Sequence, residues 1–288
     1  MAGTLYLVAT PIGNLQDITL RALETLRAAS LIAAEDTRRT RALLTHFAIS
    51  GKHVVACNAH ASPEELAGLV ERLRAGENVA LVTDAGTPSV SDPGTPLVRS
   101  AVAAGIGVVP IPGVSAVTTA VAASGLVDGP FRFVGFLPSK TSRRSALLSE
   151  VALSREPCVL FEAPHRIAET LRDLATLAPE REAVVCRELT KLHEELLRGS
   201  LATLAAKAES APLRGEITLV VAAAPESELK APLDEAAIDE SILSGLRAGE
   251  SPRSVVEALA AACPMPRREL YRRVTELAQK LSAEAVDE

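Results

Sequence analysis

The stretch from Leu81 to Pro96, LVTDAGTPSVSDPGTP, limits the folds open to this chain more than any other segment. A run of apolar and β-branched residues predicts a short buried strand that ends at Asp84. Two glycines and three prolines follow within eleven residues, so the loop is stiff but has no side-chain bulk at Gly86. Thr95 and Pro96 then predict a helix start with the Thr95 hydroxyl as its cap. A strand, loop and helix in this order form the unit in which open α/β sheets bind ligands.

This loop has an alternative interpretation, because a well-made turn often has the same composition. Asp84 and Asp92 stand at the two ends of the loop and favour a binding loop.

Strands and helices alternate on both sides of the loop, which predicts an α/β fold with a parallel or mostly parallel sheet. A second α/β set begins near Phe131, and the two sets meet near residues 112–130, the kind of interface that ligands favour. The predicted strands are 4–10, 31–34, 54–57, the strand from Val79, 108–111, 131–136, 158–161, 183–186 and 216–222.

From Pro225 the composition changes to Glu, Ser, Lys and Pro, which indicates a linker. Predicted helices over 235–247, 252–262 and 267–281 resemble a helix-turn-helix unit with a cluster of arginines. The alternative is a small helical module whose exposed face is basic. Residues 226–288 hold 8 Lys and Arg against 13 Asp and Glu, so the module is acidic overall. We therefore predict three parts: an N-terminal α/β domain (1–113), a C-terminal α/β domain (114–224), and a linker with a helical extension (225–288).

The composition excludes several classes of protein. Hydrophobic residues make up 48% and aromatic residues 2% with no Trp, so a core of Ala, Leu and Val is expected and base stacking on exposed rings is disfavoured. The formal net charge of −6 argues against a broad basic surface, although local basic patches stay open. The histidines and cysteines lack metal-site spacing, so no metal is predicted. The chain begins without a signal peptide or spanning helix, which predicts a cytoplasmic protein with no membrane partner.

No serine nucleophile elbow, P-loop or Rossmann glycine fingerprint occurs in the sequence. What remains is a cleft formed by strand-end loops of Pro, Gly, Asp and small residues, which bind through backbone amides and carbonyls. Such a lining suits a flat, amphipathic, cationic cofactor.

Eight segments span nearly the whole α/β part in order: LYLVATPIGNLQDIT (5–19), AEDTR (34–38), DAGTPSVSDPG (84–94), PIPGVSA (110–116), GFLPSK (135–140), FEAPHR (161–166), CRELTK (186–191) and GEITLVV (215–221). In these segments the chain resembles the tetrapyrrole-methylase-like class of S-adenosylmethionine-dependent methyltransferases. Within that class it is similar to the branch that methylates a cytidine ribose 2′-hydroxyl in the decoding region of 16S ribosomal RNA. The resemblance implies a homodimer, two α/β domains, and S-adenosyl-L-methionine in the cleft between them.

Residue by residue, the resemblance implies ten cofactor contacts: Pro11, Asp84, Ala85, Gly86, Val90, Ser91, Ser115, Ala116, Phe161 and Thr218. A ribose hydroxyl is weakly acidic, so methyl transfer to it calls for a base or a cationic neighbour. The candidate bases are Asp36 and Glu162, and the candidate phosphate or oxyanion partners are Arg38, Lys140 and Arg166.

Each catalytic candidate has a structural alternative. Asp36 fits the cap of the following helix, Glu162 and Arg166 fit an i,i+4 ion pair, and Lys140 fits a solvated loop charge. His165 is a further possible base, with a structural role as its alternative.

Two other functions compete with RNA methylation. One is a methyltransferase of the same fold that acts on a tetrapyrrole or another small molecule; the AEDTR and LPSK segments and the tail count against it. The other is a regulator that binds a small ligand in its α/β part and DNA through its tail. An RNA substrate requires basic residues around the cleft, for which the candidates are Arg38, Arg39, Arg41, Lys140, Arg143 and Arg144.

Overall fold

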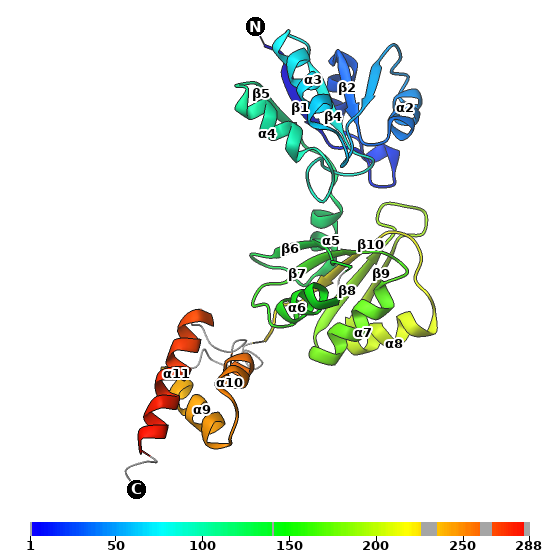
Figure 1. Cartoon of the computed structure of the whole chain (residues 1–288). Helices are drawn as coiled ribbons and strands as arrows, with labels where there is room; N and C mark the ends of the chain where they lie inside the picture. Colours follow the sequence, from blue (N-terminus) through cyan, green and yellow to red (C-terminus); the bar gives the residue numbers. More distant parts are fainter. Residues whose placement is uncertain (1, 140, 226–234, 260–266, 285–288) are drawn as a thin grey trace. The chain divides into compact units, whose positions relative to one another are not determined.

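The structure is a computed structural model that describes residues 2–139, 141–225, 235–259 and 267–284. The chain divides into two compact units, residues 1–224 and 225–288. The first unit contains two sheets with their helices, and the second contains helices (Figure 1). The predicted fold class is confirmed, whereas the three predicted domains stay a prediction.

The first sheet is parallel throughout, as predicted. Its strand order is β3-β2-β4-β1-β5. Helices α1 (Leu20–Ala28) and α2 (Thr37–His46) cover one face, and α3 (Pro63–Arg74) and α4 (Thr95–Ala103) cover the other. Because both faces are covered, the strands are nearly continuous runs of apolar residues. They are β1 (Thr4–Val8), β2 (Leu31–Ala34), β3 (His53–Ala56), β4 (Val79–Val82) and β5 (Gly107–Ile111).

The helix starts follow local capping chemistry, with one correction. Thr19 caps α1, and Ser62 with Glu65 forms a complete capping box at α3. The predicted Thr95 cap of α4 is wrong, because Gly94 is the N-cap residue and makes no side-chain hydrogen bond. Gly94 has φ 134°, and a Cβ there would lie 2.7 Å from Leu81 Cδ2, so the position requires glycine.

The second sheet is mixed, and its strand directions were not predicted from the sequence. Its strand order is β6-β7-β10-β8-β9, and among these pairs only β6 and β7 run parallel. The sequence prediction missed β9, because charged residues and Gly199 interrupt its apolar run. The five strands are β6 (Arg132–Phe136), β7 (Cys158–Glu162), β8 (Glu182–Arg187), β9 (Glu195–Ser200) and β10 (Ile217–Val221).

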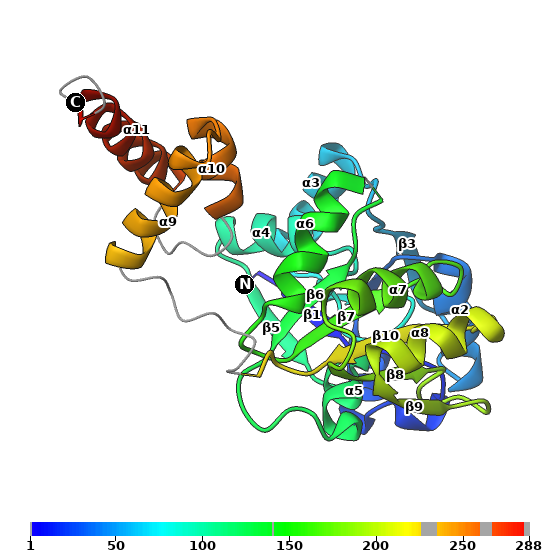
Figure 2. The same cartoon turned by 90° about the horizontal axis from the view of Figure 1, so that it is seen from below.

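Helices also cover both faces of the second sheet. Helix α5 (Ala116–Ser124) packs on one face through Val117 and Ala120. Helices α6 (Thr141–Ala152), α7 (Ile167–Leu177) and α8 (Leu201–Ser210) cover the other face, and Figure 2 shows α7 and α8 side by side. Cys158 and Cys186 are buried in this sheet. Cys57 is buried in the core between the first sheet and helices α3 and α4, so all three act as small core residues.

The second unit contains α9 (Glu235–Arg247), α10 (Pro252–Leu259) and α11 (Arg267–Glu284). Their apolar faces share one small core that includes Ile242 and Leu270. Arg273 bonds to Asp239 within this unit, at 2.6 and 3.0 Å, so this arginine of the predicted basic cluster has a structural role. No helix among the described residues is both long and apolar enough to cross a membrane.

Candidate active site

The predicted ligand loops meet at one edge of the first sheet. Strands β2, β4 and β1 are neighbours in the sheet, so the loops that follow their carboxyl ends come together. Thr10 in the first loop and Gly86 in the third exchange two backbone hydrogen bonds of 2.9 Å each. Gly86 has φ 80°, a conformation that glycine adopts without strain.

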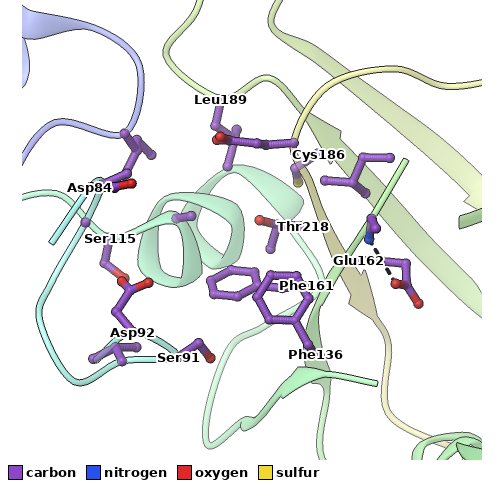
Figure 3. Close-up of a pocket in the computed structure, with 18 of the residues that line it drawn as sticks. Asp84, Ser91, Asp92, Ser115, Phe136, Phe161, Glu162, Cys186, Leu189 and Thr218 are labelled. Carbon is purple, nitrogen blue, oxygen red and sulfur yellow. Dashed lines mark hydrogen bonds between the residues drawn. The ribbon is translucent and has the colours of Figure 1, made fainter. Parts of the chain in front are cut away.

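A cavity of about 340 Å³ opens at this edge, between segments that belong to both sheets (Figure 3). Nine of the ten predicted cofactor residues line it: Asp84, Ala85, Gly86, Val90, Ser91, Ser115, Ala116, Phe161 and Thr218. The tenth, Pro11, lines a neighbouring cavity of about 390 Å³, and Arg39 and Asp84 line both cavities.

Sequence reasoning did not select several other lining residues. Phe136 and Leu189 line the first cavity, and the Phe136 and Phe161 rings lie 5.4 Å apart between centroids. The acidic side chain of Glu35 also belongs to the wall, and so does Asp92, which the sequence indicated as part of a binding loop but not as a site residue. These residues lie inside the segments that resemble the methylase class, but loop residues gave no periodic pattern to separate Phe136, Leu189 and Glu35 from their neighbours.

Asp84 is held from three directions. Its Oδ1 accepts a hydrogen bond from the Asp36 backbone N–H at 3.1 Å, and Arg39 Nη1 lies 3.3 Å from its Oδ2. Its own N–H donates to Glu35 Oε2 at 3.1 Å. This network ties the β4 loop to the start of α2 and fixes the Asp84 carboxylate in the wall.

Asp92 lies in the same wall and is half-buried. Burial, together with the negative charges of Glu35 and Asp84, raises the pKa of Asp92 to about 7. The Asp92 carboxyl is therefore partly protonated at neutral pH.

Asp36 and Arg38 interact at the N-terminus of α2 and do not line the cavity. Asp36 is the N-cap of α2: its Oδ1 accepts from the Arg38 N–H at 2.8 Å, and its Oδ2 accepts from Arg38 Nη2 at 2.9 Å. These bonds to Arg38 lower the pKa of Asp36 to about 2. The geometry is that of the capping alternative, and a carboxylate with so low a pKa is a weak base.

Glu162 is buried at the end of β7 and lines the cavity. Its Oε1 accepts from the Ala163 N–H at 2.9 Å and lies 3.6 Å from Arg166 Nε, as the i,i+4 alternative predicts. Arg166 itself does not line the cavity; it donates to the backbone oxygens of Leu137 and Pro138, at 3.2 and 3.1 Å. The pair therefore holds the loop that follows β6. Lys140, predicted in that loop, lies outside the described residues.

Loops of the two sheets contact each other beside the cavity. The Asn14 N–H donates to Thr190 Oγ1 at 3.1 Å, and a Cβ added at Gly13 would lie 2.3 Å from Lys191 Cγ. Non-glycine residues adopt positive φ in two of the loops here, at Ser89 (70°) and Ser91 (62°) and again at Thr190 (65°). Backbone strain from positive φ at non-glycine residues is common at functional sites, where surrounding contacts hold the loop in place.

Comparison with known proteins decides the family. Residues 4–205 match the family model of the tetrapyrrole (corrin/porphyrin) methylases. The chain is 42% identical over 279 residues to ribosomal RNA small subunit methyltransferase I of Streptococcus pyogenes serotype M1, with 96% of each chain covered. It is 45% identical over 278 residues to the protein of that name in Synechocystis sp., covering 96% of this chain and 98% of the relative. The chain belongs to the ribosomal RNA small subunit methyltransferase I family.

This membership makes the protein a methyltransferase enzyme. The fold agrees with solved structures of other tetrapyrrole methylases. Uroporphyrin-III C-methyl transferase from Thermus thermophilus, solved with S-adenyl homocysteine, superposes with a TM-score of 0.55 at 19% identity. The match covers 76% of this chain and 97% of that one.

In this family member, the distribution of basic side chains bears on which residues could contact RNA. Arg38 and Arg39 are 88% and 67% exposed at the side chain, and Arg143 is also exposed. The inclusion of Arg144 among the RNA-facing residues is wrong, because it is buried and its Nη1 lies 3.1 Å from Asp173 Oδ2. The α6 sequence places Arg143 and Arg144 next to each other, and the helix turns the second one inward.

Proposed function

We propose that the protein transfers a methyl group from S-adenosyl-L-methionine to the ribose 2′-hydroxyl of a cytidine in the decoding region of small-subunit ribosomal RNA. The observation that supports this most is a strand-end cavity lined by nine of the ten expected cofactor residues, in a chain 42–45% identical to proteins named ribosomal RNA small subunit methyltransferase I.

The cavity fits the methyl donor in size and charge. About 340 Å³ lies within the range of small-molecule sites. Carboxylates of Asp84 and Glu35 give the wall a negative potential that suits a sulfonium cation, and the Phe136 and Phe161 rings offer apolar surface to an aromatic base. When bound, S-adenosylmethionine supplies a methyl group activated by its positive sulfur. The protein's task is then to orient the acceptor and to remove one proton.

The residues proposed to contact RNA are basic side chains beside the two cavities. Arg39 lines both cavities, and the exposed Arg38 lies one residue before it on α2. Both suit phosphate oxygens of an approaching strand. Of the predicted catalytic residues, Glu162 and Arg166 have contacts that support a positioning role for the loop after β6, and Asp36 has contacts that support a cap.

The remaining partners belong to the same proposal. The substrate is the assembled small subunit rather than free RNA, the working form is a homodimer, and the compartment is the cytoplasm, where small subunits are available.

The test is transfer of labelled methyl from S-adenosylmethionine to small subunits that lack the modification, followed by nuclease mapping of the labelled nucleotide. Deproteinised 16S RNA and a uroporphyrinogen serve as parallel acceptors. Label on a cytidine ribose of the subunit supports the proposal. Label on the tetrapyrrole alone would favour the alternative, a methyltransferase of the same fold with a small-molecule substrate. Light scattering of the purified chain reports the dimer independently.

A further inference from the structure

Five carboxylates line the first cavity, and they differ in what holds them: Glu35, Asp84, Asp92, Glu162 and Glu216. Glu35 and Asp84 take part in the network at the start of α2. Glu162 accepts from Ala163 and from the Thr170 hydroxyl, the latter at 2.7 Å. Glu216 Oε2 lies 3.1 Å from Lys191 Nζ. Among the residues that the structure describes, Asp92 alone of the five has neither a hydrogen bond nor an ion pair at its carboxyl group.

The loop around Asp92 holds this carboxyl in place from the backbone. Ser89 and Ser91, on either side of Val90, have φ of 70° and 62°, so the backbone just before Asp92 is left-handed at two non-glycine positions. A Cβ at Gly135 of β6 would lie 3.2 Å from Ser91 Oγ, which shows how closely the second sheet supports the loop. The Asp92 side chain points into the cavity (Figure 3). A carboxyl aimed into the site without a protein partner is available to a substrate.

We propose that the Asp92 carboxylate accepts the proton of the ribose hydroxyl as this hydroxyl is methylated. The inference rests on the proposed function. The hydroxyl oxygen forms a bond to the methyl carbon, the bond from that carbon to sulfur breaks, and its electron pair stays on sulfur. The hydroxyl proton moves to an Asp92 oxygen and leaves later to water. Atoms and charge balance without any other reactant.

The electrostatics around Asp92 suit this task. A general base works best when its pKa lies near the working pH, and burial together with the charges of Glu35 and Asp84 brings the pKa of Asp92 to about 7. The charged groups that share the wall with it are Glu35 and Arg39 near α2, Asp84 after β4, Glu162 at the end of β7 and Glu216 before β10. Of these groups, Glu35 and Asp84 favour protonation of Asp92 through their negative charges.

Asp92→Asn in the full chain separates this role from cofactor binding. Asn has the same shape but cannot accept the proton, so we expect methyl transfer to small subunits to fall about 100-fold or more. The wild-type rate should rise with pH through about pH 7, and this rise should be absent in the variant. S-adenosylmethionine affinity, measured by calorimetry, should change less than about threefold, since a general base acts in the transition state. Asp128→Asn, an exposed aspartate outside the cavity, is the matched control.

A second measurement does not depend on turnover. Carbon-13 NMR of the aspartate carboxyls in the ligand-free wild type should show one group that titrates near pH 7 and is missing from Asp92→Asn. Titration of Asp92 at the ordinary value for aspartate would overturn the proposal. So would retained transfer by Asp92→Asn with S-adenosylmethionine binding weakened tenfold or more, which would make Asp92 a cofactor ligand. Absence of transfer by the wild type itself would remove the proposed function, and this inference with it.

Discussion

Thr170 donates its hydroxyl hydrogen to Glu162 Oε2 over 2.7 Å, and Thr170 Oγ1 accepts a hydrogen bond from Arg144 Nη2 at 3.0 Å. All three side chains are buried. One hydroxyl of α7 therefore connects a carboxylate of the cavity wall with the buried arginine of α6. Glu162 is in turn 3.6 Å from Arg166, which holds the loop after β6, so the shape of that loop depends on a bond made beneath the cavity.

Thr170→Val tests this connection. Valine keeps the shape but leaves Glu162 Oε2 and Arg144 Nη2 each without that partner, and a buried polar group that loses its partner costs about 1–3 kcal/mol. We expect the free energy of unfolding in urea to fall by about that amount. Thr176→Val is the control on the same helix, because Thr176 is exposed and its hydroxyl donates to the Arg172 backbone oxygen of its own helix. Equal losses in the two variants would show that the buried network contributes nothing.

Gly86→Ala tests the conformation of the cavity loop. Gly86 has φ 80°, and a non-glycine residue in this region costs about 1–2 kcal/mol. The new Cβ meets nothing closer than Ile12 Cγ2 at 3.6 Å, so the loss of stability comes from backbone strain. Gly51→Ala is matched, since Gly51 has φ 70° and open space around it. We expect both variants to melt at similarly lower temperatures, and Gly86→Ala alone to bind S-adenosylmethionine more weakly in calorimetry. Equal cofactor affinity in both would remove Gly86 from the binding loop.

Local sequence signals predicted most of the first sheet. The apolar runs at Leu31–Ala34 and Val79–Val82 and the capping box at Ser62 follow from short-range rules, and the structure agrees with them. The second sheet was harder, because strand direction depends on pairing between distant segments. The β8–β9 hairpin has no helix between its strands, so alternation with helices gave no sign of β9.

The cavity residues also divide into features that local sequence signals predict and features that depend on distant contacts. The motif loops indicated where a ligand binds, but not how each side chain is held. Asp92 and Asp36 both lie in loops that follow a strand. Asp92 is half-buried and its carboxyl has no partner in the described part of the chain, whereas Asp36 is a helix cap. Likewise, only the rotation of α6 makes Arg144 buried and Arg143 exposed. Burial and partners arise from three-dimensional packing, which local patterns do not contain.

Arg143→Glu tests the RNA side. Arg143 is exposed in the first turn of α6, the helix that follows the GFLPSK segment. Charge reversal should weaken binding to small subunits several-fold at low salt, because a phosphate contact is replaced by repulsion, and should leave S-adenosylmethionine affinity unchanged. Arg155→Glu is the control: this exposed arginine precedes β7, at the opposite end of the strand from Glu162. Unchanged subunit affinity in Arg143→Glu would exclude Arg143 from the interface.

Asp36→Asn tests the cap through its pH dependence. Bonds to Arg38 lower the pKa of Asp36 in the folded protein to about 2, against 3.8 as its ordinary value. Its ionisation therefore stabilises the fold above about pH 4, and this contribution is lost as the pH falls through 2. Asparagine keeps a capping oxygen but not the charge. We expect the wild type to be more stable than the variant at neutral pH in urea unfolding, and the difference to vanish near pH 2. A constant difference over this range would contradict the ion pair.

Asp92→Asn should raise the free energy of unfolding above pH 7, whereas Asp36→Asn should lower it. The folded pKa of Asp92, about 7, lies above its ordinary value of 3.8, so the folded protein binds this proton more tightly than the unfolded chain does. The cost of ionising Asp92 in the fold is absent below about pH 4, grows as the pH rises, and is complete above pH 7. Asparagine never ionises, so the variant should equal the wild type near pH 4 and exceed it at pH 8. About three pKa units at about 1.36 kcal/mol each set an upper bound near 4 kcal/mol, and partial hydration reduces the expected gain to about 1–3 kcal/mol. Urea unfolding at the two pH values measures it. A variant that is more stable at pH 8 and yet loses methyl transfer would show that the protein retains an unfavourable charge at this position for catalysis. If variant and wild type were equally stable at both pH values, Asp92 would ionise as freely in the folded protein as in the unfolded chain.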